Sequence, residues 1–264
     1  MTKRLAIIAA VLCVILLILT GTILIRNDFL NKIPESAQVT PTPEPTPETT
    51  PEPTPEPTPE PTPTPDTSRF YDTDSLLICA NKKHKLPDGY IPADLTPVNV
   101  KTRYENWQLR QPAAEALENM FNAALQENIT IVCGSGYRAE AFQKVLYDGY
   151  AAQSGTEYAD SVSSRPGYSD HQTGLAVDLC ANDPATDLKE SFEETEEGKW
   201  LFAHAHEYGF ILRYPQGKEE ITGYAYEPWH YRYIGTEEAT ALYNAGENMT
   251  FEEYYNVEGG TYAE

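Results

Sequence analysis

The proline repeat over residues 41–65 restricts the fold of this 264-residue chain more than any other feature of its sequence. The repeating unit is Pro-Thr-Pro-Glu, and proline at this density removes the backbone N–H donors that helices and sheets require. The repeat therefore predicts an extended polyproline II segment that joins no folded core. Its 25 residues would reach roughly 80 Å at about 3.1 Å per residue. We expect a disordered stalk, rich in Pro, Thr and Glu, over residues 27–66.

An uncharged apolar run over residues 5–25 precedes this stalk. As a helix with a rise of about 1.5 Å per residue, it would span the roughly 30 Å hydrocarbon core of a bilayer. Lys3 and Arg4 favour a cytoplasmic N-terminus, so we predict a single-pass membrane anchor over residues 1–26 and an extracellular remainder. The alternative is a cleaved signal peptide and secretion. Against it, the run exceeds the roughly 7–15 apolar residues of such peptides, and no A-x-A-like site follows.

Residues 67–264 have ordinary mixed composition and are long enough for one domain with a sizeable core. They contain 15 Lys and Arg against 32 Asp and Glu, within a chain of formal net charge −21. No basic patch stands out that could neutralise phosphates, so the sequence argues against nucleic acid as a partner. The acidic surface offers no clear oligomer interface, and we assume a monomer.

The apolar pattern of this domain mixes helices and strands without regular βαβ alternation. Apolar residues at helical spacing predict helices over residues 112–126, 139–152, 194–208 and 237–243, the last capped by Thr236. Short apolar runs predict strands over residues 129–133, 174–179, 210–212 and 229–234. Small and polar residues predict a loop over residues 155–168. The predicted fold class is α+β, a small antiparallel or mixed sheet with flanking helices.

Two short segments carry the residue types of a catalytic zinc site. His171 and Asp178 lie seven residues apart around Gly174, and Glu-Pro-Trp-His at residues 227–230 adds a second histidine and a second carboxylate. A catalytic zinc ion takes three protein ligands of this kind and leaves one position open. We predict His171, Asp178 and His230 as the ligands, and Glu227 as the general base. Pro228 favours a turn or a strand entry here, instead of the helix of H-E-x-x-H peptidases.

Other residues suit the recognition of a peptide carboxylate. Arg138 follows a Gly-Ser-Gly turn at the end of a predicted strand, which would point its guanidinium into a cleft towards a carboxylate or an oxyanion. Ser169 lies two residues before His171, so on an extended chain both would face the same side. Weaker candidates for substrate contacts or for lining the cleft are Gln143, Tyr214 and Trp229.

The remaining histidines and cysteines indicate no second site. His204 and His206 are two residues apart on a predicted helix, where they do not share a face, and we interpret them as structural. Three cysteines of the domain, Cys79, Cys133 and Cys180, are interpreted as small buried hydrophobic residues. A disulfide between Cys79 and Cys133 stays open as an alternative.

Three segments together resemble the D-alanyl-D-alanine carboxypeptidases of the VanY type, including the related L,D-carboxypeptidases. The segments are SGYRAEAFQ at residues 135–143, SDHQTGLAVDL at residues 169–179 and GFILRYPQGKEEITGYAYEPWHYRYIG at residues 209–235. The family pattern S-x-H-x-x-G-x-A-x-D falls without a gap on Ser169, His171, Gly174, Ala176 and Asp178. Its E-P-W-H pattern falls on residues 227–230.

This resemblance implies a zinc peptidase that trims a terminal D-alanine from peptidoglycan stem peptides on the cell-wall side of the membrane. It implies one zinc ion per chain, Glu227 as the base, and Arg138 as the group that binds the substrate carboxylate or the oxyanion. The zinc ligands that it implies are His171, Asp178 and His230. The lesser substrate contacts that it implies are Gln143, Ser169 and Tyr214.

Two alternatives differ from this interpretation in class. One is a wall-binding or sensing module that keeps the zinc pocket without catalysis, although binding alone needs no base at Glu227. The other is an endopeptidase that cuts inside the stem or cross-bridge, which would not need a carboxylate-binding Arg138. The sequence also leaves open whether the scissile bond is of the D,D or the L,D kind.

Overall fold

A computed structural model describes residues 67–104 and 106–262 of the chain. The predicted anchor over residues 1–26 and the predicted stalk over residues 27–66 lie outside the described residues. Within the described part, no helix has the length and apolar content needed to cross a membrane.

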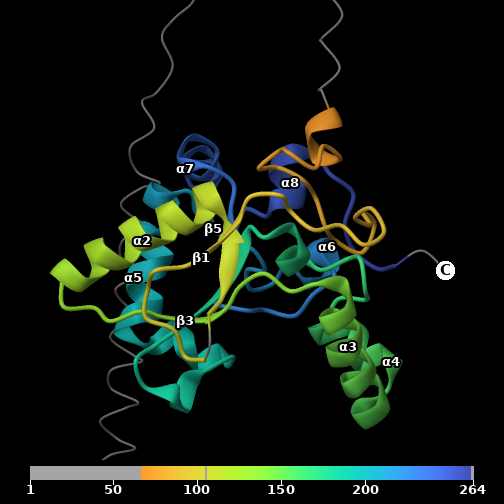
Figure 1. Cartoon of the computed structure of the whole chain (residues 1–264), viewed down its shortest axis with the longest axis horizontal. Helices are drawn as coiled ribbons and strands as arrows, with labels where there is room; N and C mark the ends of the chain where they lie inside the picture. The colour runs from red at the N-terminus through yellow and green to blue at the C-terminus, as the bar shows by residue number, and fades with distance from the viewer. Residues whose placement is uncertain (1–66, 105, 263–264) are drawn as a thin grey trace, which may run out of the picture. The chain divides into compact units, whose positions relative to one another are not determined.

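A four-stranded antiparallel sheet forms the centre of the domain (Figure 1). Its strand order is β3-β4-β6-β5, and a separate antiparallel pair consists of β1 and β2. The strands are β1 (Leu95–Pro97), β2 (Gln108–Arg110), β3 (Val132–Ser135), β4 (Ala176–Cys180), β5 (Phe210–Leu212) and β6 (His230–Tyr233). Together with the helices around the sheet, this arrangement confirms the predicted α+β class, and the sheet is antiparallel throughout.

Helices surround this sheet, and the sequence explains where two of the helical segments begin or end. Pro112 lies in the first turn of α2, where its missing N–H costs nothing. Gly209, with a φ of 86°, ends the segment of α5 and η5 in the left-handed conformation. The α-helices are α2 (Gln111–Gln126), α3 (Glu140–Ser154), α4 (Thr156–Val162), α5 (Glu196–His204), α6 (Glu219–Thr222), α7 (Thr236–Ala245) and α8 (Phe251–Tyr255). Short 3-10 helices include η2 (Asp170–Thr173) and η5 (Ala205–Tyr208).

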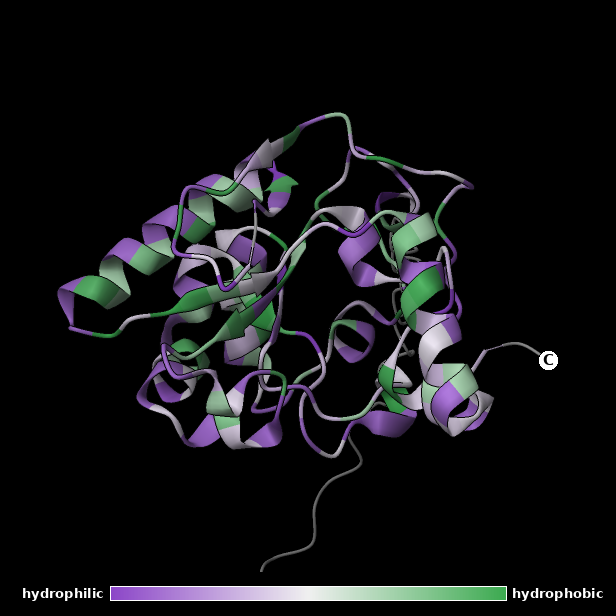
Figure 2. Ribbon diagram, turned by 60° about the horizontal axis from the view of Figure 1, so that its bottom comes forward, coloured by the Kyte–Doolittle hydropathy of each residue, from purple (hydrophilic) through white to green (hydrophobic). Residues whose placement is uncertain are grey.

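Two apolar cores form on the sheet, and hydrophobic residues gather along its central strands (Figure 2). The first core joins the sheet to α2 and α5, and its members include Leu117, Val177, Leu179, Leu201 and Tyr231. The second core joins β5 to α7, α8 and the start of the domain, and its members include Phe70, Ile211, Leu242, Phe251 and Tyr255. Leu175, Val177 and Leu179 thus lie in the first core, as the strand alternation predicted, which leaves the other face of β4 to Asp178.

Some predicted elements differ from the structure. The predicted loop over residues 155–168 is wrong, because α4 occupies residues 156–162, buries Ala159 and packs beside α3 (Figure 1). The strand predicted over residues 129–133 lies at Val132–Ser135, since pairing with β4 extends it through Gly134. Thr236 is the first residue of α7 and not its cap, and α7 is followed by α8, whose Thr250 and Glu253 form a capping box.

Candidate metal centre

The register between β4 and β6 places Asp178 directly opposite His230. Side chains on a strand alternate between its two faces, so the neighbours Val177 and Tyr231 enter the first core while Asp178 and His230 share the opposite face. Residues in such a cross-strand pair have adjacent side chains. A one-residue slip in this register would separate the two groups onto opposite faces of the sheet.

His171 reaches the same place from η2, just before β4. Gly174 ends η2 with a φ of 70°, and a Cβ there would approach the side chains of Leu95, Arg110 and Pro92 to 3.0–3.2 Å. Glycine suits this position for both reasons. The Nδ1 atom of His171 lies 2.8 Å from the carbonyl oxygen of Gly136, which fixes the ring and turns Nε2 towards Asp178.

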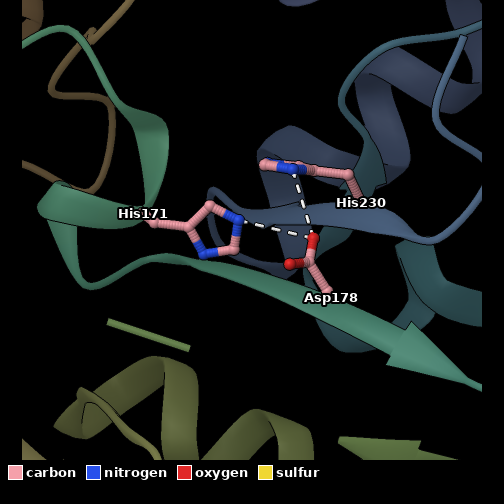
Figure 3. Close-up of side chains that lie close together, drawn as sticks. All are labelled: His171, Asp178 and His230. Carbon is pink, nitrogen blue, oxygen red and sulfur yellow. Dashed lines mark ion pairs between the residues drawn. The ribbon is translucent and has the colours of Figure 1, made fainter. Parts of the chain in front are cut away.

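Asp178 lies between the two imidazoles (Figure 3). Its Oδ1 atom is 3.4 Å from Nε2 of His171 and 3.4 Å from Nδ1 of His230. One ligand atom from each residue lies within 4.8 Å of the others, and all three residues are buried. Nε2 of His171 and Oδ1 of Asp178 have no hydrogen-bond partner among the described residues. Buried polar atoms rarely remain unpaired, so two nitrogens and one carboxylate oxygen fit a zinc ion here.

Glu227 borders this group from the turn that precedes β6. Its Oε2 atom lies 3.3 Å from Nδ1 of His230. The backbone N–H of Glu227 donates to the carbonyl of Tyr214, and the N–H of His230 donates to the carbonyl of Glu227. The segment is therefore a turn that enters a strand, as Pro228 predicted. Burial raises the pKa of Glu227, although the adjacent His230 opposes this effect, and a raised pKa suits a carboxylate that takes up and releases a proton.

The charges around the trio favour a cation. Burial opposes a protonated His230, but the carboxylates of Asp170, Glu227 and Asp178 outweigh it and raise the pKa of His230 to about 9. Carboxylates that stabilise a proton at this place also stabilise a metal cation beside it. Burial, supported by the positive charge of Arg138, lowers the pKa of His171 and so favours its neutral form, which is the form that binds metal.

Arg138 lies beside the metal group, held by a hydrogen bond from its backbone N–H to the carbonyl of His171. Its guanidinium acts on the pKa of His171, Asp178 and Glu227. The Nε atom of Arg138 is buried and has no hydrogen-bond partner within the described part of the chain. An arginine in this state is available to an anionic group of a ligand.

The weaker predicted contacts lie in different places. Gln143 is buried, and its Nε2 atom donates to Ser163 Oγ and to the carbonyl of Ser164. The ring of Tyr214 lies 4.7 Å from the ring of His230, so Tyr214 borders the metal group. Trp229 lies in the turn before β6 and packs, partly buried, against the first core. That it lines the cleft stays a prediction.

Ser169 also needs a correction. It is buried at the N-terminus of η2, and His171 lies inside η2, so the extended chain assumed for this pair is wrong. Between them lies Asp170, which sequence reasoning did not single out. Asp170 is buried, and its Oδ2 atom lies 3.6 Å from Nε2 of His230. The only signal for it in the sequence was an acidic residue directly between two motif positions.

The other histidines and the cysteines lie outside this group. The ring of His206 stacks on the ring of Tyr243 at 3.7 Å, and His204 lies 3.2 Å from Glu207. Cys79, Cys133 and Cys180 are buried free thiols that form no disulfide with any described residue. Burial raises the pKa of both Cys79 and Cys180 to about 12. The interpretation of these cysteines as buried small residues is confirmed, and the alternative Cys79–Cys133 bridge is wrong.

Comparisons with known proteins agree with this geometry. Residues 106–236 match the family model described as VanY: D-alanyl-D-alanine carboxypeptidase. The putative carboxypeptidase YodJ of Bacillus subtilis is 40% identical over 186 residues, which are 69% of this chain and 67% of YodJ. The chain therefore spans about two thirds of the length of that relative.

Two solved structures are similar to the domain. The LdcB LD-carboxypeptidase is 38% identical with a TM-score of 0.64, over 70% of this chain and 87% of that one. A mutant of the vancomycin resistance D,D-pentapeptidase VanY, in complex with Zn(II), is 32% identical with a TM-score of 0.54, over 68% of this chain and 98% of that one.

Proposed function

The chain belongs to the VanY family of D-alanyl-D-alanine carboxypeptidases, and we infer that it is a zinc-dependent enzyme that removes the terminal D-alanine from peptidoglycan stem peptides. The observation that carries this inference is the convergence of His171, Asp178 and His230 on one buried point, with Glu227 beside it. A non-catalytic module would have no use for a buried glutamate with a raised pKa at this position.

The residues of the metal centre have two different roles in hydrolysis, metal binding and proton transfer. His171, Asp178 and His230 would hold the ion, which when bound acidifies water and polarises a carbonyl group. Glu227 takes a proton from the attacking water while the oxygen of that water bonds to the carbonyl carbon of the last peptide bond. As that C–N bond breaks, Glu227 gives the proton to the nitrogen of the departing D-alanine. Its 3.3 Å distance from His230 keeps it next to the reacting atoms.

Arg138 is placed to bind an anionic group of the substrate. Its partnerless Nε atom and its position beside His171 suit it to the C-terminal carboxylate or to the oxyanion of the substrate. The substrate of a carboxypeptidase has a free carboxylate next to the scissile bond, whereas the substrate of an endopeptidase does not. This role of Arg138 therefore favours a carboxypeptidase over an endopeptidase.

We expect Arg138→Ala to lower kcat/KM by about 10²-fold, because one strong anion donor is lost. A paired substrate with an amidated C-terminus identifies the anion that Arg138 binds. If Arg138 binds the carboxylate, the parent discriminates against the amide and Arg138→Ala does not. Equal discrimination by both proteins would instead assign Arg138 to the oxyanion.

Mass spectrometry of defined muropeptides tests the function itself. We expect the zinc-loaded protein to shorten a pentapeptide or a tetrapeptide stem by one D-alanine, and a chelator to abolish the reaction. Comparison of the two substrates determines whether the enzyme cleaves D,D or L,D bonds. Release of an internal fragment would indicate an endopeptidase, and no release by zinc-loaded protein would indicate a binding module.

We further propose that the domain is held on the outer side of a cell membrane, and that residues 27–66 are its stalk. The uncharged run over residues 5–25 and the basic pair before it support this location. The full chain is then expected in the membrane fraction, and a chain that begins at residue 67 in the soluble fraction. If cells that express the full chain instead release into the medium a protein shortened at its N-terminus, that result would support a cleaved signal peptide.

A further inference from the structure

Four charged side chains are buried directly behind the metal centre. Asp170, Arg213 and Arg232 are each 1% exposed, and Glu252 is 2% exposed. Charged side chains are almost never buried to this extent unless they are paired, and such pairs do not by themselves guarantee extra stability. Their place beside a metal ligand suggests that the network has a role in the zinc site.

The network forms a chain of contacts from α8 to His230. The two terminal nitrogens of Arg213 donate to the two carboxylate oxygens of Glu252 at 2.6 and 2.8 Å. Nε of Arg213 lies 3.7 Å from Oδ2 of Asp170, and this oxygen lies 3.6 Å from Nε2 of His230. Arg232 donates to the other oxygen of Asp170. Among these four side chains, Asp170 is the one that faces the imidazole of His230, while the backbone N–H of Arg213 donates to the carbonyl of His230.

The two nitrogens of His230 face different partners. Nδ1 faces Asp178 and Glu227 at 3.4 and 3.3 Å, so Nδ1 is the ligand atom. Nε2 of His230 and Oδ2 of Asp170 have no hydrogen-bond partner in the described part of the chain, and they face each other. A histidine that binds a metal commonly donates its second N–H to a carboxylate, which fixes the ring. His171 differs, since its second nitrogen faces the carbonyl of Gly136.

Glu252 comes from α8, beyond residue 236, where the matched family segment ends. A capping box at Thr250 and Glu253 fixes the start of α8. Glu252 also accepts a hydrogen bond from Nδ2 of Asn81, at 2.9 Å. The helix α8 is therefore joined to Arg213 by two buried hydrogen bonds.

We propose that Glu252 is a positioning residue of the zinc site, which acts through Arg213 and Asp170 to hold His230 with Nδ1 towards Asp178. The inference rests on the proposed function, because it assumes that His230 binds zinc. Glu252 neutralises Arg213 with two hydrogen bonds. Without that negative charge, the guanidinium of Arg213 would interact more strongly with Oδ2 of Asp170. It would then compete with Nε2 of His230 for that oxygen. His230 would then lose the contact that orients its ring.

The test compares Glu252→Gln with Glu253→Gln in the full chain. Glu253 is the next residue of α8, where it closes the capping box and pairs with Lys218, so its substitution disturbs α8 without touching Arg213. Zinc affinity is measured by competition with a chromogenic chelator, and ligand geometry by the visible spectrum of the Co²⁺-substituted protein. We expect Glu252→Gln to weaken zinc binding by about 10–100-fold and to shift the Co²⁺ bands. We expect Glu253→Gln to leave both unchanged.

A double variant keeps the test decisive if Glu252→Gln does not fold. Arg213→Gln combined with Glu252→Gln removes both charges, so nothing competes for Asp170, and zinc affinity returns to within a few-fold of the parent. The proposal is overturned if folded Glu252→Gln binds zinc like the parent, if Glu253→Gln weakens binding equally, or if the double variant is weakened tenfold or more. Parent protein that binds zinc but releases no D-alanine would refute the proposed function and leave these zinc measurements valid.

Discussion

Glu227→Ala is expected to retain zinc and to lose turnover by about 10²–10⁴-fold, the usual contribution of a positioned general base. Glu227 lies outside the trio whose ligand atoms converge, so its removal leaves all three ligands in place. Its carboxylate lies 3.3 Å from His230, where the proton of the attacking water must be received. Zinc content by mass spectrometry and D-alanine release by a coupled assay check the two halves of this expectation.

Glu220→Ala is the matched control for Glu227→Ala, because Glu220 is an exposed glutamate of α6. It should behave like the parent in both assays. If Glu227→Ala released D-alanine as fast as Glu220→Ala, the assignment of the base would be wrong. If Glu227→Ala lost its zinc, Glu227 would be a ligand instead of a base.

His171→Ala is expected to have the larger effect on metal binding. It removes one of three ligands, so zinc affinity should fall by more than the roughly 10–100-fold that loss of an outer-shell partner costs. Activity at stoichiometric zinc should fall to the level of chelated parent. A ligand that binds only the folded state stabilises it by about 1.4 kcal/mol for each tenfold excess over Kd. A chelator should therefore lower the Tm of the parent and leave that of His171→Ala unchanged.

His204→Ala provides the comparison for His171→Ala. His204 ends α5, lies 3.2 Å from Glu207 and has no place in the metal group. Its substitution should leave zinc content, activity and the response of Tm to a chelator as in the parent. A loss of zinc in His204→Ala equal to that in His171→Ala would contradict the assigned ligand set.

The metal centre was predictable from the sequence because its residues sit in motifs of fixed spacing. Alternation along one strand was enough to separate Asp178 from the apolar residues around it. The E-P-W-H segment then supplied the remaining ligand and the base. The structure adds the cross-strand register between Asp178 and His230, which no local pattern specifies, because it depends on pairing between distant segments.

What the sequence did not reveal depends on tertiary contacts. The helix α4 has weak apolar periodicity of its own and packs against α3, so residues 155–168 resembled a loop. The sequence did not single out Asp170 or Glu252, because only the fold places them against buried arginines. The packing of Trp229 against the first core also depends on tertiary contacts, because this residue lies in the turn before β6 and not on the strand.

The pairing of β4 with β6 has a consequence for the order of events during folding. Asp178 and His230 are 52 residues apart (230 − 178), and closing a loop of that size is slow relative to forming local helices. One of the three ligands, His230, is therefore out of place until this long-range pairing is complete. A zinc site with all three ligands is therefore expected only in a chain that has formed this pairing.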